Sequence, residues 1–78
     1  MTQPIATARR YHVRLAEHVH GGRIVAEASF EAAGVAFAED WSHAEPDAEI
    51  RVIVRDEDSG EERCYRIDLA DGETAPCG

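Results

Sequence analysis

Residues 50–69 form two runs in which apolar and polar side chains alternate, and this pattern limits the fold more than any other feature of the chain. The alternating apolar residues are Ile50, Val52 and Val54 in the first run and Tyr65, Ile67 and Leu69 in the second. Between them stands Asp58-Ser59-Gly60-Glu61, a sequence rich in turn formers. Two period-2 runs around a Ser-Gly turn predict a β-hairpin that is apolar on one face.

The period of the pleat also predicts the register of this hairpin. A loop of two or four residues keeps the apolar set on one face, whereas a three-residue loop would place Val52 opposite Arg66. The even loop predicts the pairs Val54 with Tyr65, Val52 with Ile67, Ile50 with Leu69, Arg51 with Asp68 and Asp56 with Arg63. Each of the two charge pairs favours this register by roughly a few tenths of a kcal/mol.

The first half of the chain predicts two further strands and one helix. Residues 10–18 and 23–28 alternate, and Gly21-Gly22 between them suits a tight turn because glycine tolerates positive φ. Ser29 is a good N-cap for a helix whose apolar stripe is Phe30, Ala33, Gly34, Phe37, Ala38 and Trp41. Gly34 is expected where the helix comes close to the sheet. The order β-β-α-β-β predicts an α+β fold, a two-layer sandwich of one helix packed on a four-stranded, mostly antiparallel sheet.

Length and composition indicate one small domain. With 78 residues, the chain buries only roughly 60% of its unfolded surface. We expect a flexible segment at 1–8, the domain at 9–70 and a flexible tail at 71–78. There is neither an apolar run long enough for a membrane helix nor a signal peptide, so a soluble cytoplasmic protein is expected. Two cysteines, Cys64 and Cys77, do not make a disulfide framework, and in a reducing compartment we expect free thiols.

The predicted register separates charge between the two faces of the sheet. It places Tyr11, Val13, Leu15, Val19, Ile24, Ala26 and Ala28 on the side of the helix. It places His12, Arg14, His18, His20, Val25, Arg51, Ile53, Arg55, Cys64 and Arg66 on the opposite side, with only Glu27 and Asp68 as acids there. A chain of net charge −8, in which all eight basic residues are arginine, is thus expected to have one positively charged face.

An arginine-rich face suggests a binding surface for an anion or an acidic protein segment, centred on Arg14, Arg51, Arg55 and Arg66. Self-association through the same face is a second interpretation, because arginine is enriched at interfaces. The simplest alternative is a solvated face whose arginine stems cover Val25 and Ile53. Nucleic acid is not expected as a partner, because the net charge is negative and no aromatic residue lies on this face for base stacking. A membrane is not expected as a partner either.

The rival hypothesis is a small-molecule or metal site formed by His12, His18, His20 and Cys64. Two imidazoles at i and i+2 lie on one side of a strand, and with a thiolate they could hold zinc. The neighbouring arginines would repel a dication, so no metal or other cofactor is expected.

Catalysis is not expected either. Residues 40–43 contain the letters of a catalytic triad, Asp40, Ser42 and His43. Side chains of successive residues at a helix end point in different directions, whereas a triad is assembled from distant positions. No glycine-rich phosphate loop is present, because Gly21-Gly22 does not precede a helix in the required pattern. We therefore expect a small bacterial-type protein that acts as a non-enzymatic interaction module.

The predicted order of elements and the C-terminal Cys77-Gly78 carry a resemblance to a known family. The β-β-α-β-β order resembles ubiquitin-like β-grasp proteins, and some bacterial sulfur carriers of that fold end in Gly-Gly on a flexible tail. The resemblance covers the element order alone, and the penultimate residue here is Cys77. It implies, as a third hypothesis, a carrier acting through Cys77.

Overall fold

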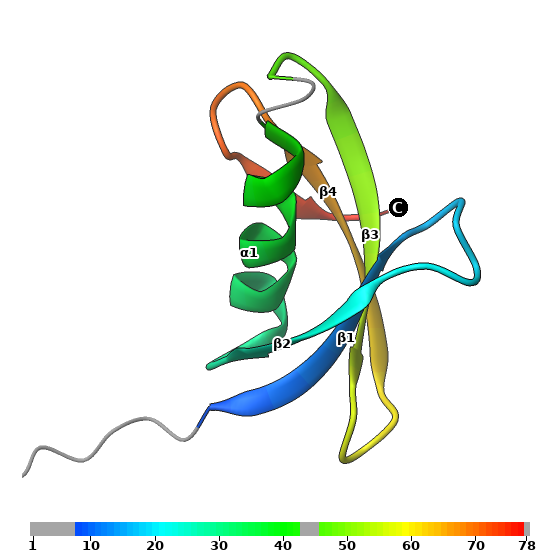
Figure 1. Ribbon diagram of the computed structural model, residues 1–78. Helices are drawn as coiled ribbons and strands as arrows, with labels where there is room; N and C mark the ends of the chain where they lie inside the picture. Colours follow the sequence, from blue (N-terminus) through cyan, green and yellow to red (C-terminus); the bar gives the residue numbers. More distant parts are fainter. Residues whose placement is uncertain (1–7, 43–45, 78) are drawn as a thin grey trace, which may run out of the picture.

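One helix lies across a five-stranded antiparallel sheet in the computed structural model of the chain (Figure 1). The structure describes residues 8–42 and 46–77. The strands are β1 (Arg9–Leu15), β2 (Arg23–Glu27), β3 (Glu49–Asp56), β4 (Glu62–Asp68) and β5 (Thr74–Pro76), and the helix is α1 (Phe30–Ser42). The strand order is β2-β1-β3-β4-β5, and every neighbouring pair is antiparallel. The predicted α+β class with one helix on the sheet is confirmed.

Helix α1 carries the chain over β1, since it joins β2 to β3 and β1 lies between them in the sheet. Both β2 and β3 are antiparallel to β1, so they run in the same direction. The segment between them therefore makes a crossover between parallel strands, as its length allows. All the helix contacts fall on one face of the sheet, which leaves the other face without a covering layer in the described part of the chain (Figure 1).

The helix begins and packs as its sequence predicts. The Ser29 hydroxyl accepts a hydrogen bond from the backbone N–H of Ala32 at 3.1 Å, which is the expected N-cap. The stripe residues Ala33, Phe37 and Ala38 are buried. At Gly34 an added Cβ would lie 3.4 Å from a methyl group of Val52 on β3. The predicted close approach of helix and sheet at Gly34 is therefore confirmed.

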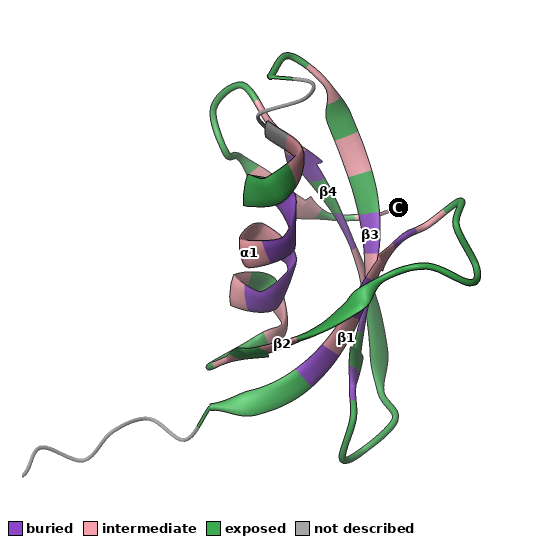
Figure 2. Cartoon of the chain, in the orientation of Figure 1, coloured by how far each residue is buried: buried purple, intermediate pink, exposed green. Residues whose placement is uncertain are grey.

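The core lies between α1 and the three central strands. Buried residues alternate with exposed or half-buried ones along these strands (Figure 2). The sheet side of the core consists of Tyr11, Val13, Leu15, Val52, Val54, Tyr65 and Ile67. Ile50 and Leu69, at the ends of the predicted hairpin, are partly buried against this cluster. The apolar set predicted by alternation in β1, β3 and β4 is thus the set that the helix covers.

The register of β3 and β4 differs from the prediction by two residues. Val52 lies opposite Tyr65, Val54 opposite Arg63, and Arg51 opposite Arg66 rather than Asp68. The cause is the turn, which starts one residue earlier because the Asp56 carboxylate accepts the backbone N–H groups of Asp58 and Ser59 at 2.8 and 3.3 Å. A shift of two residues keeps each side chain on its face but changes its partner.

The two faces of β2 were predicted the wrong way round, because its register against β1 differs by seven residues, an odd number, from the one that a two-residue turn at 21–22 gives. Tyr11 lies opposite Val25, and His12 lies opposite Ile24, so Val25 and Glu27 face the helix and Ile24 faces away. Strand β1 ends at Leu15, and a seven-residue connection at 16–22 replaces the two-residue turn. At Gly22, where φ is 105°, an added Cβ would lie 2.3 Å from the Val13 carbonyl oxygen, so this close approach to β1 requires glycine.

The C-terminal residues also depart from the prediction. Instead of a flexible tail from residue 71, Thr74–Pro76 form β5 and pair with β4. A disulfide joins Cys64 on β4 to Cys77, so the expectation of free thiols is corrected as well. The alternation of a three-residue strand is too short to be seen in a sequence. The expected N-terminal segment falls, apart from Ala8, outside the described residues.

Candidate functional site

The face of the sheet turned away from α1, called here the outer face, carries five of the eight arginines. They are Arg10 and Arg14 on β1, Arg51 and Arg55 on β3, and Arg66 on β4. Each alternates with residues buried under the helix, such as Tyr11, Val52 and Tyr65. The structure therefore places the four arginines predicted as binding residues on one face, and adds Arg10 to them.

Arg51 and Arg66 face each other directly across β3 and β4. The backbone bonds from Asp56 N–H to the Glu61 carbonyl and from Leu69 N–H to the Ala48 carbonyl set the hydrogen-bonded pairs of this ladder, and they make 51 and 66 a non-hydrogen-bonded pair. Side chains are closest in such pairs, where Cα atoms lie about 4.5 Å apart. Two like charges opposite each other destabilise a sheet unless a third group of opposite charge binds them.

The outer-face arginines form no ion pair in the described part of the chain, although acids lie near some of them. In residues 8–42 and 46–77, no ion pair or side-chain hydrogen bond is found for Arg10, Arg51, Arg55 or Arg66. Arg14 is held by the carbonyls of Leu15 and Ala16, at 3.2 and 3.1 Å, which orient its guanidinium without cancelling its charge. Acids stand at the strand ends: Glu49 and Asp68 oppose each other, and Glu62 lies opposite Arg55. Glu49, Asp68 and Glu73 line a hollow of about 230 Å³ together with Arg66, so the end of the outer face beside Arg66 is partly acidic.

The three arginines on the helix side are, by contrast, all paired. Arg9 contacts Asp56 at 2.9 Å, Arg23 contacts Asp40, and Arg63 contacts Glu61 at 2.8 Å. Arg63 and Arg23 also lie over the rings of Phe30 and Phe37, at 4.1 and 5.9 Å from the ring centroids. Arg23 and Arg63 thus contact the helix from the sheet, and Arg9 links β1 to β3, so the two sets of arginines differ in their environment.

The remainder of the outer face is small and mostly aliphatic. Half-buried Ile53 lies opposite Cys64, whose disulfide to Cys77 is on the same face, and His12 lies between Ile24 and Arg55. The tyrosines of the sheet, Tyr11 and Tyr65, are buried on the helix side. The outer face thus presents guanidinium groups around a narrow aliphatic centre, and no Phe, Tyr or Trp side chain of β1 to β5 lies on it.

The structure separates the histidines that the metal hypothesis groups together. His12 lies on β1, whereas His18 and His20 belong to the connection at 16–22 and not to a strand. Among the residues that the structure describes, no group of three or more His, Cys, Asp or Glu side chains is placed to hold a metal ion. Cys64 and Cys77 are bonded to each other, so in this form neither sulfur is available as a ligand or as a carrier thiol. His43 of the triad letters lies outside the described residues.

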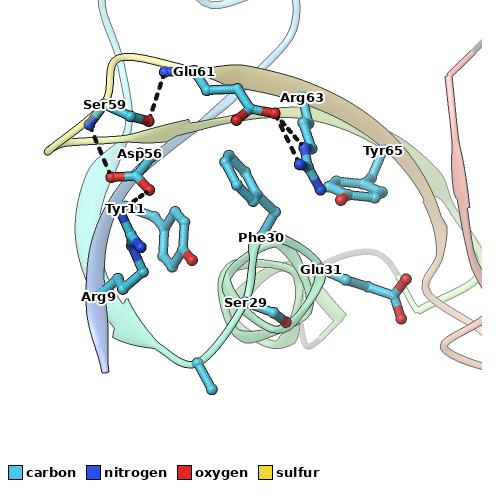
Figure 3. A pocket seen from close by; sticks show the side chains of 11 residues that line it. Arg9, Tyr11, Ser29, Phe30, Glu31, Asp56, Ser59, Glu61, Arg63 and Tyr65 are labelled. Carbon is cyan, nitrogen blue, oxygen red and sulfur yellow. Dashed lines mark hydrogen bonds and ion pairs between the residues drawn. The ribbon is translucent and has the colours of Figure 1, made fainter. Parts of the chain in front are cut away.

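A second feature is an open cavity of about 680 Å³ at the N-terminal end of α1 (Figure 3). Phe30 lies in its middle, between the ring of Tyr11, with centroids 5.0 Å apart, and the guanidinium of Arg63. Both arginines that line it are already neutralised, Arg9 by Asp56 and Arg63 by Glu61. Its charges are therefore satisfied within the fold, unlike those of the outer face.

The ion pairs of this cavity also shift the pKa values of Asp56 and Arg63. Burial acts to raise the pKa of the Asp56 carboxyl, but the N–H groups of Asp58 and Ser59 and the charge of Arg9 together hold that pKa below its usual value. The hydrogen bond to Glu61, and secondly that to Tyr65, raises the pKa of Arg63. Asp56 was missed by sequence reasoning as a structural centre, although it stands two residues before Asp58-Ser59-Gly60, a sequence of turn formers. Arg10 was missed as an outer-face residue although the strand predicted at 10–18 included it.

No helix in residues 8–42 and 46–77 has both the length and the apolar character needed to cross a bilayer. No curated protein and no solved structure matches the chain significantly. One protein-family model matches, and it covers residues 9–78, which include all five strands and the helix. Its description is "Family of unknown function (DUF5961)", and the chain belongs to this family.

Proposed function

We propose that this protein is a non-enzymatic binding module whose outer face takes an acidic segment of a partner protein. The observation that carries the proposal is the juxtaposition of Arg51 and Arg66 in a non-hydrogen-bonded pair with no acid between them. An arginine fork binds a carboxylate through two parallel hydrogen bonds. Two such forks side by side suit a run of Asp or Glu side chains, which would also relieve the repulsion between them.

An acidic protein segment fits this surface better than a nucleic acid does. Single-stranded nucleic acids are bound by aromatic platforms that stack on the bases, and Tyr11 and Tyr65 are buried against the helix at 2% and 8% exposure. The body of net charge −8 would also repel a long phosphate backbone beyond the outer face. A short acidic peptide in extended form is small enough to remain over the arginines.

The test is a titration of the protein with an oligo-glutamate peptide at low salt, followed by amide and arginine Nε–H chemical shifts. Arg51→Glu combined with Arg66→Glu is expected to weaken binding at least about tenfold, because two charge-assisted contacts become repulsive. The shifts in the native protein are expected along β1, β3 and β4 on the outer face. Circular dichroism of the double variant should be unchanged, since both side chains are exposed.

A matched control separates charge from geometry. Arg51→Lys with Arg66→Lys keeps both positive charges but removes the planar fork, so binding should fall between that of the native protein and that of the glutamate variant. Oligo-lysine serves as the control peptide and should not bind this face. Unchanged oligo-glutamate affinity in a folded Arg51→Glu, Arg66→Glu protein would contradict the proposal, as would the absence of binding by the native protein.

A further inference from the structure

The two edges of the sheet differ in how they are protected. Edge strand β5 has three residues, ends in Pro76 and is tied to β4 by a disulfide. Short strands and prolines are the usual devices that block pairing at an edge. Edge strand β2 has five residues and no proline, and among the described elements only β1 pairs with it. The β2 edge is therefore the open one.

The ladders identify which backbone groups of β2 are free. Hydrogen bonds from Glu57 N–H to the Arg10 carbonyl and from Ala16 N–H to the Arg51 carbonyl show that even-numbered residues of β1 bond to β3. Odd-numbered residues of β1 therefore bond to β2, through the pairs 9–27, 11–25 and 13–23. It follows that the N–H and C=O groups of Ile24 and Ala26 point outward from the edge, available to a further strand.

The side chains of β2 have a symmetric arrangement about Val25. Arg23 and Glu27 lie two residues before and after it, on the same side of the strand. If a second β2 is laid antiparallel with its Val25 opposite this Val25, each Arg23 meets the partner subunit's Glu27. The same register pairs Ile24 with the partner subunit's Ala26, which are the residues whose backbone groups are free.

We propose that two copies of this chain associate through their β2 edges, antiparallel and centred on Val25, to form a continuous ten-stranded sheet. This is strand addition at an exposed edge, applied symmetrically so that the same patch serves both copies. Both helices then lie on one side of the joined sheet, and both outer faces lie on the other. The proposed interface contains none of the outer-face arginines, so it is independent of the proposed acidic partner.

Other registers of the two β2 strands pair fewer charged side chains. Centring the pair on Ala26 places Val25 opposite the charged Glu27, and centring it on Ile24 places Arg23 opposite Val25, so both lose the two charge pairs. The Val25 register also covers Ile24, which is 49% exposed and one of two large apolar side chains left open in the described structure. Arg23 already contacts Asp40, but both side chains are about half exposed, and a guanidinium has five N–H donors to share.

The first experiment measures solution mass by light scattering against protein concentration. The native protein is expected to move from 8.6 kDa toward twice that mass as the concentration rises. Arg23→Glu and Glu27→Arg, each alone, make both cross-strand pairs like-charged, and each should weaken dimerisation about tenfold or more. An equimolar mixture of the two variants restores opposite charges in both pairs of the mixed dimer, so its affinity should return to that of the native protein.

A second variant tests the backbone pairing without changing charge. Ala26→Pro removes an N–H that faces solvent at the edge, where proline is tolerated, so the fold should persist while the dimer is lost. Arg51→Glu with Arg66→Glu should leave the dimer intact, which separates this inference from the proposed function. A native protein that stays at 8.6 kDa up to about 1 mM overturns the proposal, because that limit corresponds to a binding free energy weaker than about −4 kcal/mol. So does a mixture no tighter than the single variants, or an Ala26→Pro protein that still forms the dimer.

Discussion

At the scale of single residues, Asp56 joins three parts of the molecule. Its side chain is 5% exposed, and its two oxygens bind the turn N–H groups of Asp58 and Ser59 on one side and Arg9 of β1 on the other. Because these contacts hold the pKa of Asp56 below its ordinary value of 3.8, its charge stabilises the fold at every pH above that value. This stability is expected to be lost as the pH falls through the lowered pKa.

The change to test is Asp56→Asn, which keeps the shape and one acceptor oxygen but removes the charge. We expect a clear loss of unfolding free energy near pH 7, measured by urea denaturation, and a loss that shrinks below pH 3.8 because the native carboxyl becomes neutral too. Asp58→Asn is the control, since that acid is exposed in the same turn. Equal effects of the two substitutions at neutral pH would show that Asp56 has no special role.

At the scale of elements, Gly34 is a point where α1 lies close to β3. A methyl group there would lie 3.4 to 3.6 Å from the methyl groups of Val52, Ile67 and Val54, which is ordinary van der Waals contact. Gly34→Ala is therefore expected to raise the unfolding free energy, by up to about 1 kcal/mol, through higher helix propensity. Gly34→Val overfills the same space and should lower it by roughly 1–3 kcal/mol. Denaturant titrations of both variants check the pair, and a stabilising valine would contradict the close approach.

The strands show which features the alternation of apolar and polar residues predicts and which it does not. In β1, β3 and β4 one buried face imposes a period of two, so the faces of Val52 and Arg51 could be predicted even though the pairing is shifted by two residues. In β2 the apolar residues Ile24, Val25 and Ala26 follow one another, so alternation favours neither face, and the longer connection at 16–22 decided the register instead. Alternation predicted the face of the outer-face arginines but not the ion pairs of the three arginines on the helix side. Their partners Asp56, Asp40 and Glu61 come close through turns and through the packing of the helix on the sheet, which alternation does not predict.

At the scale of the whole molecule, the disulfide between Cys64 and Cys77 turns a C-terminal segment into part of the sheet. Only three residues of β5 pair with β4, and such a short strand adds little stability by itself. The backbone bonds from Cys77 N–H to the Cys64 carbonyl and from Asp68 N–H to the Glu73 carbonyl, both 2.9 Å, stand at the two ends of this pairing. The disulfide thus holds β5 at the edge of the sheet, where it lies beside Arg66 of the outer face.

Reduction is therefore expected to release β5 while the central strands persist. The crosslink spans 13 residues, and a loop of that size stabilises a fold by about 3 kcal/mol, so the unfolding free energy should fall by up to that amount in reductant. Hydrogen exchange should show lost protection at Cys77 and retained protection at the buried strands β1 and β3. Cys64→Ser with Cys77→Ser should match the reduced protein and be insensitive to reductant. A native protein whose stability does not change on reduction would show instead that β5 is held by its hydrogen bonds alone.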